Sequence, residues 1–164
     1  MISQLFITIG YIIFFISRFK KRKKYILITD NISRCCFIIG YILLNSINGI
    51  EHTIYGIFRN FVGQIMDKKK RVCKILVFII MIFILIVMYV LSFTGFSTIL
   101  FIISGIINLF TVFFMKEQGI RLGTAFAAIC NIIAFFLLQS NASIIGESLC
   151  GIIGIVSFIK EYKS

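Results

Sequence analysis

The sequence predicts an all-α polytopic membrane protein with seven transmembrane helices, arranged as two parallel three-helix bundles joined by a linker helix. Three observations support this prediction. Hydrophobic residues make up 60% of the chain and charged residues only 14%, whereas a soluble domain carries about 25% charged residues. The apolar residues form runs long enough to cross a bilayer. The first part of the chain also aligns with the last part as an internal repeat.

The first three spans are expected in the N-terminal part of the chain. Residues 2–17 form a short apolar run that ends at a basic segment, residues 18–24. Residues 25–44 form the second span, which contains Asp30 and Arg34. Residues 53–66 form a weak third span around Arg59.

Two long runs account for the other four spans. Residues 75–115 contain no charge and would make a helix of about 60 Å at 1.5 Å per residue, about twice a hydrocarbon core. We expect a break at residues 92–98, where hydroxyl residues and Gly95 interrupt the run. Residues 119–159 are likewise too long for one helix, and we expect a break at residues 139–143.

The internal repeat has a period of 95 residues. It pairs residues 5–69 with residues 100–164 without a gap, and roughly a quarter of the pairs are identical. Two three-helix units in the same orientation need an odd number of helices between them, which one helix supplies. We therefore expect a first bundle at residues 1–70, a linker at 71–94 and a second bundle at 95–164.

Lysine and arginine predict the orientation. They cluster at residues 18–24, 68–74, 116–121 and 160–163, and seven spans place all four clusters on one side. Cytoplasmic loops carry the excess of positive charge. We therefore expect a bacterial inner (cytoplasmic) membrane protein with its N-terminus outside and its C-terminus in the cytoplasm. Because the basic residues follow the first apolar run instead of preceding it, that run is not expected to be a cleaved signal peptide.

Several short motifs resemble a known family. They are residues 18–24 after the first span, Phe58-Arg59-Asn60-Phe61-Val62 in the third, and Gly146-Glu147-Ser148 with Gly151-Ile152-Ile153-Gly154 in the seventh. Together they resemble the YgjV-like bacterial inner-membrane proteins, which look related in architecture to the SWEET, PQ-loop and PnuC-type proteins. The resemblance implies transport of a small solute. The chain has no proline, so it departs from the proline-hinged sugar transporters among these relatives.

Polar residues inside the predicted spans are the candidate site. An arginine near a helix centre costs about 2.5 to 3.5 kcal/mol on insertion scales, so it normally faces the protein interior or water. We expect six residues to line a common central cavity that binds a polar or anionic solute: Arg34, Arg59, Asn60, Asn108, Asn131 and Glu147.

A structural role for the same residues is the alternative. Asp30 and Arg34 are spaced i, i+4 and could simply pair with each other. Arg59 could extend to the headgroups along its own stem, and the asparagines could be hydrogen-bond links between helices. His52, the one histidine, is expected in a hydrated loop, with a proton-linked role as the less favoured interpretation.

Other functions have little support. The five cysteines and one histidine show no zinc-ligand spacing, and no nucleophile or phosphate-binding motif occurs. We expect no enzyme activity, no catalytic residue, no metal and no cofactor. The charge of +11 lies at helix ends, where topology and anionic lipid account for it, so nucleic acid is not an expected partner.

Two functions remain open. The first is a transporter of a small polar or anionic solute that alternates access between its two three-helix bundles. The second is a non-transporting scaffold, sorting or lipid-interacting protein of the same architecture. The lipid bilayer is the expected partner in both, and a homo-oligomer is left open.

Overall fold

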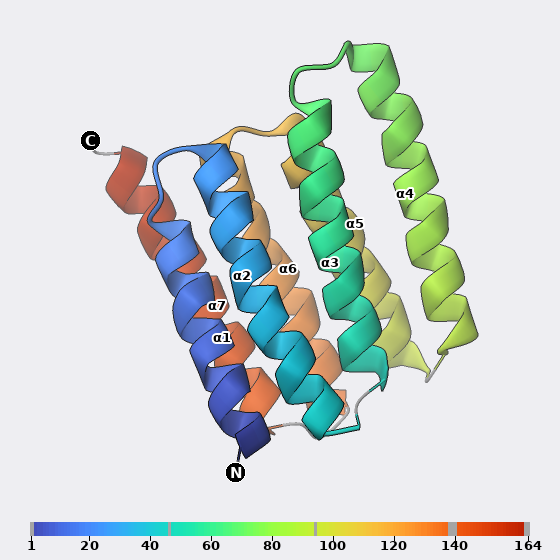
Figure 1. Cartoon of the computed structure of the whole chain (residues 1–164), viewed down its shortest axis with the longest axis vertical. Coiled ribbons are helices and arrows are strands. Elements are labelled where there is room, and N and C mark those ends of the chain that lie inside the picture. The colour runs from blue at the N-terminus through green and yellow to red at the C-terminus, as the bar shows by residue number, and fades with distance from the viewer. Residues whose placement is uncertain (1, 46, 94, 138–140, 163–164) are drawn as a thin grey trace. The chain divides into compact units, whose positions relative to one another are not determined.

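The computed structural model describes residues 2–45, 47–93, 95–137 and 141–162, and these residues form seven α-helices (Figure 1). The helices are α1 (Ile2–Arg18), α2 (Lys23–Leu43), α3 (Ile47–Met66), α4 (Arg71–Leu91), α5 (Phe96–Phe114), α6 (Glu117–Leu137) and α7 (Asn141–Tyr162). This result confirms the predicted all-α class and the expected number of helices.

Five of the described helices are long and apolar enough to cross a membrane. They are α2, α4, α5, α6 and the Ser143–Lys160 part of α7. Helix α1 is apolar but shorter. Helix α3 does not meet the same test, so its crossing of the membrane stays a prediction.

Helix α3 begins earlier than the sequence predicted. The expected third span starts at residue 53, whereas α3 starts at Ile47 and includes Glu51 and His52. The prediction that His52 lies in a hydrated loop is therefore wrong. Two polar residues before an apolar run suggest a boundary in the sequence, but Glu51 and His52 are half-buried on a helical face of α3.

The expected breaks in the two long runs are confirmed. Helix α4 ends at Leu91 and α5 begins at Phe96, and α6 ends before α7 begins at Asn141. Gly95, directly before α5, has φ +108°, a conformation that side chains larger than hydrogen rarely adopt. Of the residues assigned to these breaks, Thr94, Gln139 and Ser140 lie outside the described residues.

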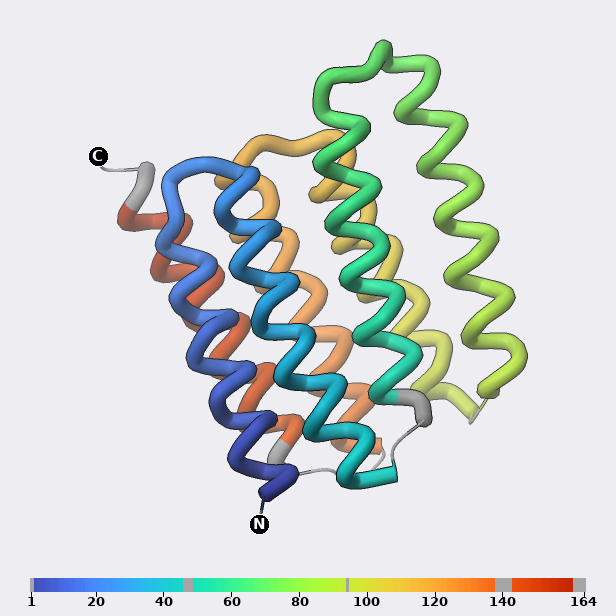
Figure 2. The backbone as a smooth tube through the Cα atoms, viewed as in Figure 1, coloured from blue at the N-terminus to red at the C-terminus, as the bar shows by residue number. Residues whose placement is uncertain are grey.

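The chain divides into two compact units. In unit 1 (Met1–Lys69), α2 packs against both α1 and α3. In unit 2 (Lys70–Ser164), α6 packs against both α5 and α7, and α4 packs against α5. Within each unit consecutive helices run in opposite directions (Figure 2). The predicted division into two bundles and a separate linker stays a prediction.

The helix bounds follow the 95-residue repeat. Adding 95 to the bounds of α1, α2 and α3 gives residues 97–113, 118–138 and 142–161. These ranges agree with α5, α6 and α7 to within one residue at each end. Each unit therefore contains one copy of the same helix pattern, with α4 as the additional helix of unit 2.

Small residues allow the helices of each unit to approach closely. In unit 1, a Cβ atom added to Gly40 would lie 3.1 Å from the main-chain oxygen of Ser3 in α1. In unit 2, a Cβ added to Gly154 of α7 would lie 2.9 Å from the main-chain oxygen of Arg121 in α6. Close approach at small residues is typical of helices that pack in lipid.

Candidate functional site

A buried carboxylate is the centre of the polar residues in unit 1. Asp30 of α2 is 1% exposed. Its Oδ1 accepts a hydrogen bond from Arg18 Nη2 at 3.4 Å, and its Oδ2 accepts one from Arg34 Nε at 3.2 Å. Asn60 Nδ2 also donates to Oδ2, and Arg59 Nη2 lies 3.9 Å from the same oxygen. We call these five residues the arginine cluster.

All three helices of unit 1 contribute to the arginine cluster. Arg18 is the last residue of α1, where its guanidinium also lies 4.1 Å from the centre of the Phe14 ring. Arg34 follows Asp30 by one helical turn, as the i, i+4 spacing predicted. Arg59, from α3, donates through Nε and Nη2 to Asn60 Oδ1 at 3.2 and 2.9 Å.

Two members of the arginine cluster lie well inside their helices. Asp30 is seven residues after the start of α2 and Arg59 is seven residues before the end of α3, which is about 10 Å in each case. The two helix ends lie together, because Lys23 Nζ and Asp67 Oδ1 form an ion pair of 2.6 Å. Asp30 and Arg59 therefore lie about two helical turns in from these helix ends, whereas Arg18 lies at the end of α1.

The arginine cluster has an excess of positive charge. Three guanidinium groups lie within 4 Å of the single Asp30 carboxylate, which gives these four side chains a formal charge of +2. Their exposed fractions are only 5%, 12% and 6% for Arg18, Arg34 and Arg59. Arginine stays protonated in proteins, and its planar fork matches carboxylate and phosphate groups. The chemistry of the cluster therefore favours an anionic group.

A glycine gives Arg34 its position. A Cβ atom added to Gly56 of α3 would lie 2.9 Å from Arg34 Nε and closer still to Cζ and Nη1. The Arg34 guanidinium therefore lies directly against the α3 backbone at Gly56. This contact holds the side chain beside Asp30 and leaves little room for another orientation.

The internal repeat contains the arginine cluster only once. Ala125, Ile129, Gly154 and Ile155 stand 95 positions after Asp30, Arg34, Arg59 and Asn60. The second copy of the helix pattern forms with apolar residues at these positions, so the pattern itself does not require the charges. Buried ion pairs are in any case weak evidence for a stabilising role. The charges in unit 1 therefore need another explanation.

Unit 2 contains a smaller polar pair. Asn131 Nδ2 of α6 donates a hydrogen bond to Glu147 Oε2 of α7 at 3.1 Å. Asn131 is buried and Glu147 is half-buried. Asn108 of α5 is half-buried, and its main-chain oxygen accepts a hydrogen bond from Thr111 Oγ1 at 3.0 Å.

Five of the six predicted site residues therefore fall into two groups, and the sixth, Asn108, lies in α5. Arg34, Arg59 and Asn60 meet around Asp30 in unit 1, and Asn131 meets Glu147 in unit 2. The common cavity that joins all six stays a prediction. Arg59 is 5% exposed and donates a hydrogen bond to Asn60, so its guanidinium is enclosed by unit 1.

Three residues at or beside the arginine cluster are not among the six predicted site residues. In the sequence, Arg18 belongs to a basic segment that predicts topology, and Asp30 is expected only as a partner for Arg34. The third is Asn31, whose Oδ1 accepts a hydrogen bond from Asn60 Nδ2 at 2.9 Å. The available signal was an aspartate inside a predicted span, since such a charge needs a cationic partner.

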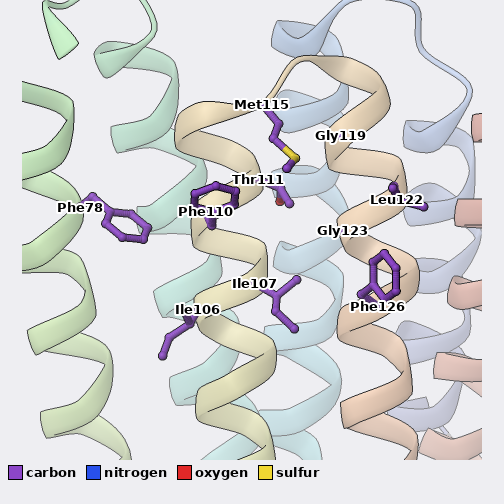
Figure 3. A pocket seen from close by; sticks show the side chains of 10 residues that line it. All are labelled: Phe78, Ile106, Ile107, Phe110, Thr111, Met115, Gly119, Leu122, Gly123 and Phe126. Atoms are coloured by element: carbon purple, nitrogen blue, oxygen red, sulfur yellow. The ribbon is translucent and has the colours of Figure 1, made fainter.

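A hollow in unit 2 has different chemistry. It has a volume of about 310 Å³ and lies along α4, α5 and α6 (Figure 3). Its lining consists of Phe78, Ile106, Ile107, Phe110, Thr111, Met115, Gly119, Leu122, Gly123 and Phe126. None of the six predicted residues lines this hollow, and its hydrocarbon surface suits an apolar group.

Comparison with known proteins identifies the family. The profile of Imp-YgjV, described as a bacterial inner membrane protein, matches residues 1–164. The chain belongs to this family, which confirms the resemblance noted in the sequence and its location in the bacterial inner membrane. No curated protein and no solved structure matches the chain.

Proposed function

We propose that this member of the Imp-YgjV family transports a small anionic solute across the inner membrane. The arginine cluster is the observation that carries the proposal. It contains a buried excess of positive charge, and the equivalent positions of the second repeat are apolar. An intramembrane charge that the fold does not require is a candidate for a substrate contact.

The proposed orientation has seven crossings. Helix α3 crosses the membrane together with the more apolar helices, because its charged residues Arg59 and Glu51 are buried or half-buried in unit 1. The N-terminus then lies outside and the C-terminus in the cytoplasm, with all the basic clusters on the cytoplasmic side. This orientation puts the arginine cluster about 10 Å from the cytoplasmic ends of α2 and α3.

The proposed mechanism is exchange of counter-ions. Without solute, Asp30 neutralises part of the charge on Arg18, Arg34 and Arg59. An incoming carboxylate or phosphate takes over some of these guanidinium contacts. Movement of the two three-helix bundles relative to each other then changes the side from which the site is reached.

Uptake into proteoliposomes tests the proposal. The purified protein is reconstituted and offered a panel of labelled small carboxylates, phosphates, neutral sugars and amines. We expect accumulation of at least one anion above protein-free vesicles and none of the amines. Failure of every anion to accumulate, or equal uptake of neutral solutes, would contradict an anion transporter.

Two variants connect the uptake to the arginine cluster. Arg59→Gln removes one buried guanidinium, and Lys20→Gln removes one exposed positive charge from the loop after α1. We expect Arg59→Gln to lower anion uptake by at least about tenfold, the effect of about 1.4 kcal/mol, and Lys20→Gln to leave it within about twofold. Equal effects of both variants would mean that uptake responds to overall charge and not to the cluster.

A non-transporting membrane scaffold is the second candidate. The mutual bonding within the arginine cluster favours it, because Asp30 and Asn60 already accept hydrogen bonds from the arginines. A scaffold role predicts that cluster variants lose stability without losing any uptake activity. Measuring stability and uptake on the same Arg59→Gln protein separates the two functions.

A further inference from the structure

The polar pair of unit 2 contains a buried oxygen that its surroundings leave unsatisfied. Asn131 is 6% exposed and donates through Nδ2 to Glu147. Its Oδ1, bonded to the same carbon as Nδ2, is buried and accepts no hydrogen bond from the described residues. Buried acceptors without a partner are rare, and an ion or a water is a common explanation.

The position of this oxygen limits what can satisfy it. Asn131 Oδ1 belongs to the same amide group whose Nδ2 donates to the Glu147 carboxylate. One polar pair therefore contains both an amide oxygen and a carboxylate. Carboxylate and amide oxygens are the ligands that hard cations prefer, so a cation that binds the pair would satisfy Oδ1.

A third oxygen lies on the same face of α7. Ser143 precedes Glu147 by four residues, which places it one turn away on the same side of the helix. The three oxygens come from two packed helices, α6 and α7. A set of several oxygen ligands fits a metal cation better than a proton, which needs only one acceptor. A single carboxylate also favours a monovalent ion, since divalent sites usually contain more acidic ligands.

The pair lies near one end of its unit. Asn131 is six residues before the end of α6 and Glu147 is six residues after the start of α7, which is about 9 Å in each case. In the proposed orientation this is the outer end. The repeat offers no second copy of the pair, because Cys36 and His52 stand at the equivalent positions of unit 1.

We propose that Asn131 and Glu147 form a binding site for an alkali-metal cation of the Na⁺ type. We further propose that this cation is the coupling ion of transport. The coupling role rests on the proposed function, whereas cation binding does not. Entry of a cation from the outer side down its gradient would then drive an anion into the cell.

Thermal or denaturant unfolding of the purified protein tests the site without any solute. NaCl is compared with KCl and choline chloride at one ionic strength and one pH. A cation that binds only the folded state shifts the unfolding equilibrium by a factor of 1 + [Na⁺]/Kd, about tenfold at a concentration about ten times the Kd. We expect Na⁺ to give this shift and choline not to.

Variants assign the effect to the pair. Glu147→Gln and Asn131→Ala are expected to abolish the stabilisation by Na⁺. Glu117→Gln is the matched control, because it removes a carboxylate from the first turn of α6, fourteen residues from Asn131. It is expected to keep the full Na⁺ effect. If the two site variants do not fold, direct binding of radioactive sodium to the unmodified protein gives the answer.

Three outcomes would overturn the site. They are equal stability of the unmodified protein in all three salts, an effect of pH with no preference among cations, and an unchanged Na⁺ effect in Glu147→Gln. Failure of the transport proposal looks different. In that case Na⁺ still stabilises the protein but no anion accumulates in vesicles, whereas anion uptake without any Na⁺ effect removes the cation site alone.

Discussion

The contact between Gly56 and Arg34 can be tested with one methyl group. Gly56→Ala places a Cβ atom 2.9 Å from Arg34 Nε and closer to two other atoms of the guanidinium. The side chain of Arg34 must then move away from α3. Its 3.2 Å hydrogen bond to Asp30 is lost or lengthened as a result.

Two opposing contributions determine the size of the effect. A hydrogen bond to a charged group contributes about 1.5 to 3 kcal/mol. In the opposite direction, alanine stabilises a helix interior by about 0.5 to 1 kcal/mol relative to glycine. We therefore expect Gly56→Ala to lower the free energy of unfolding by about 0.5 to 2.5 kcal/mol.

The repeat supplies a matched control. Gly151 is the equivalent of Gly56 in α7, and its added Cβ would meet only Ala128 Cβ, at an ordinary distance of 3.4 Å. Gly151→Ala should therefore be neutral or stabilise the protein by up to about 1 kcal/mol. Both variants are measured by denaturant titration in the same detergent micelles.

A double-mutant cycle with Arg34→Ala isolates the contact. In the Arg34→Ala protein there is no guanidinium to displace, so the loss caused by Gly56→Ala should disappear. Gly56→Ala that is as stable as Gly151→Ala would refute the reasoning. The same conclusion would follow if its cost were unchanged in the Arg34→Ala protein.

Three further predictions concern other parts of the chain. Asp30→Asn leaves three buried arginines without their carboxylate and should lower the free energy of unfolding by about 3 to 5 kcal/mol in a denaturant titration. A loss below about 1 kcal/mol would show that Asp30 does not hold the arginine cluster together. Lys23→Ala breaks an ion pair whose Asp67 side chain is 40% exposed, so the free energy of unfolding should fall by no more than about 1 kcal/mol in the same titration. A larger fall would show that the ion pair behaves as a buried one. Single cysteines at Lys21 and Lys69, in a protein without other cysteines, should both react with a membrane-impermeant thiol reagent only from the cytoplasmic side; reaction from opposite sides would refute the proposed orientation.

The sequence predicted most of the helix bounds. Residues 2–17 and 25–44 differ from α1 and α2 by no more than two residues at either end, because charged segments mark where an apolar helix leaves the hydrocarbon. The start of α3 was missed by six residues. A helix can continue through a polar residue when a neighbouring helix buries that residue. The sequence alone does not show which residues a neighbouring helix buries.

The arginine cluster was predicted only in part. The pairing of Asp30 with Arg34 follows from the 3.6-residue period of one helix. The contacts of Asp30 with Arg18 and Asn60 cross between helices. They depend on how each helix is rotated about its own axis. Side-chain packing determines this rotation, and a hydropathy pattern does not predict it.

The close contact between α6 and α7 limits which side chains the second repeat can have. The position equivalent to Arg59 is Gly154, where the backbone of α6 leaves no room even for a methyl group. An arginine in place of Gly154 would push α6 and α7 apart instead of forming a second arginine cluster. The two repeats are therefore not interchangeable. A protein engineered from two copies of unit 1 would need a wider spacing between the helices at the positions of α6 and α7 than unit 2 has.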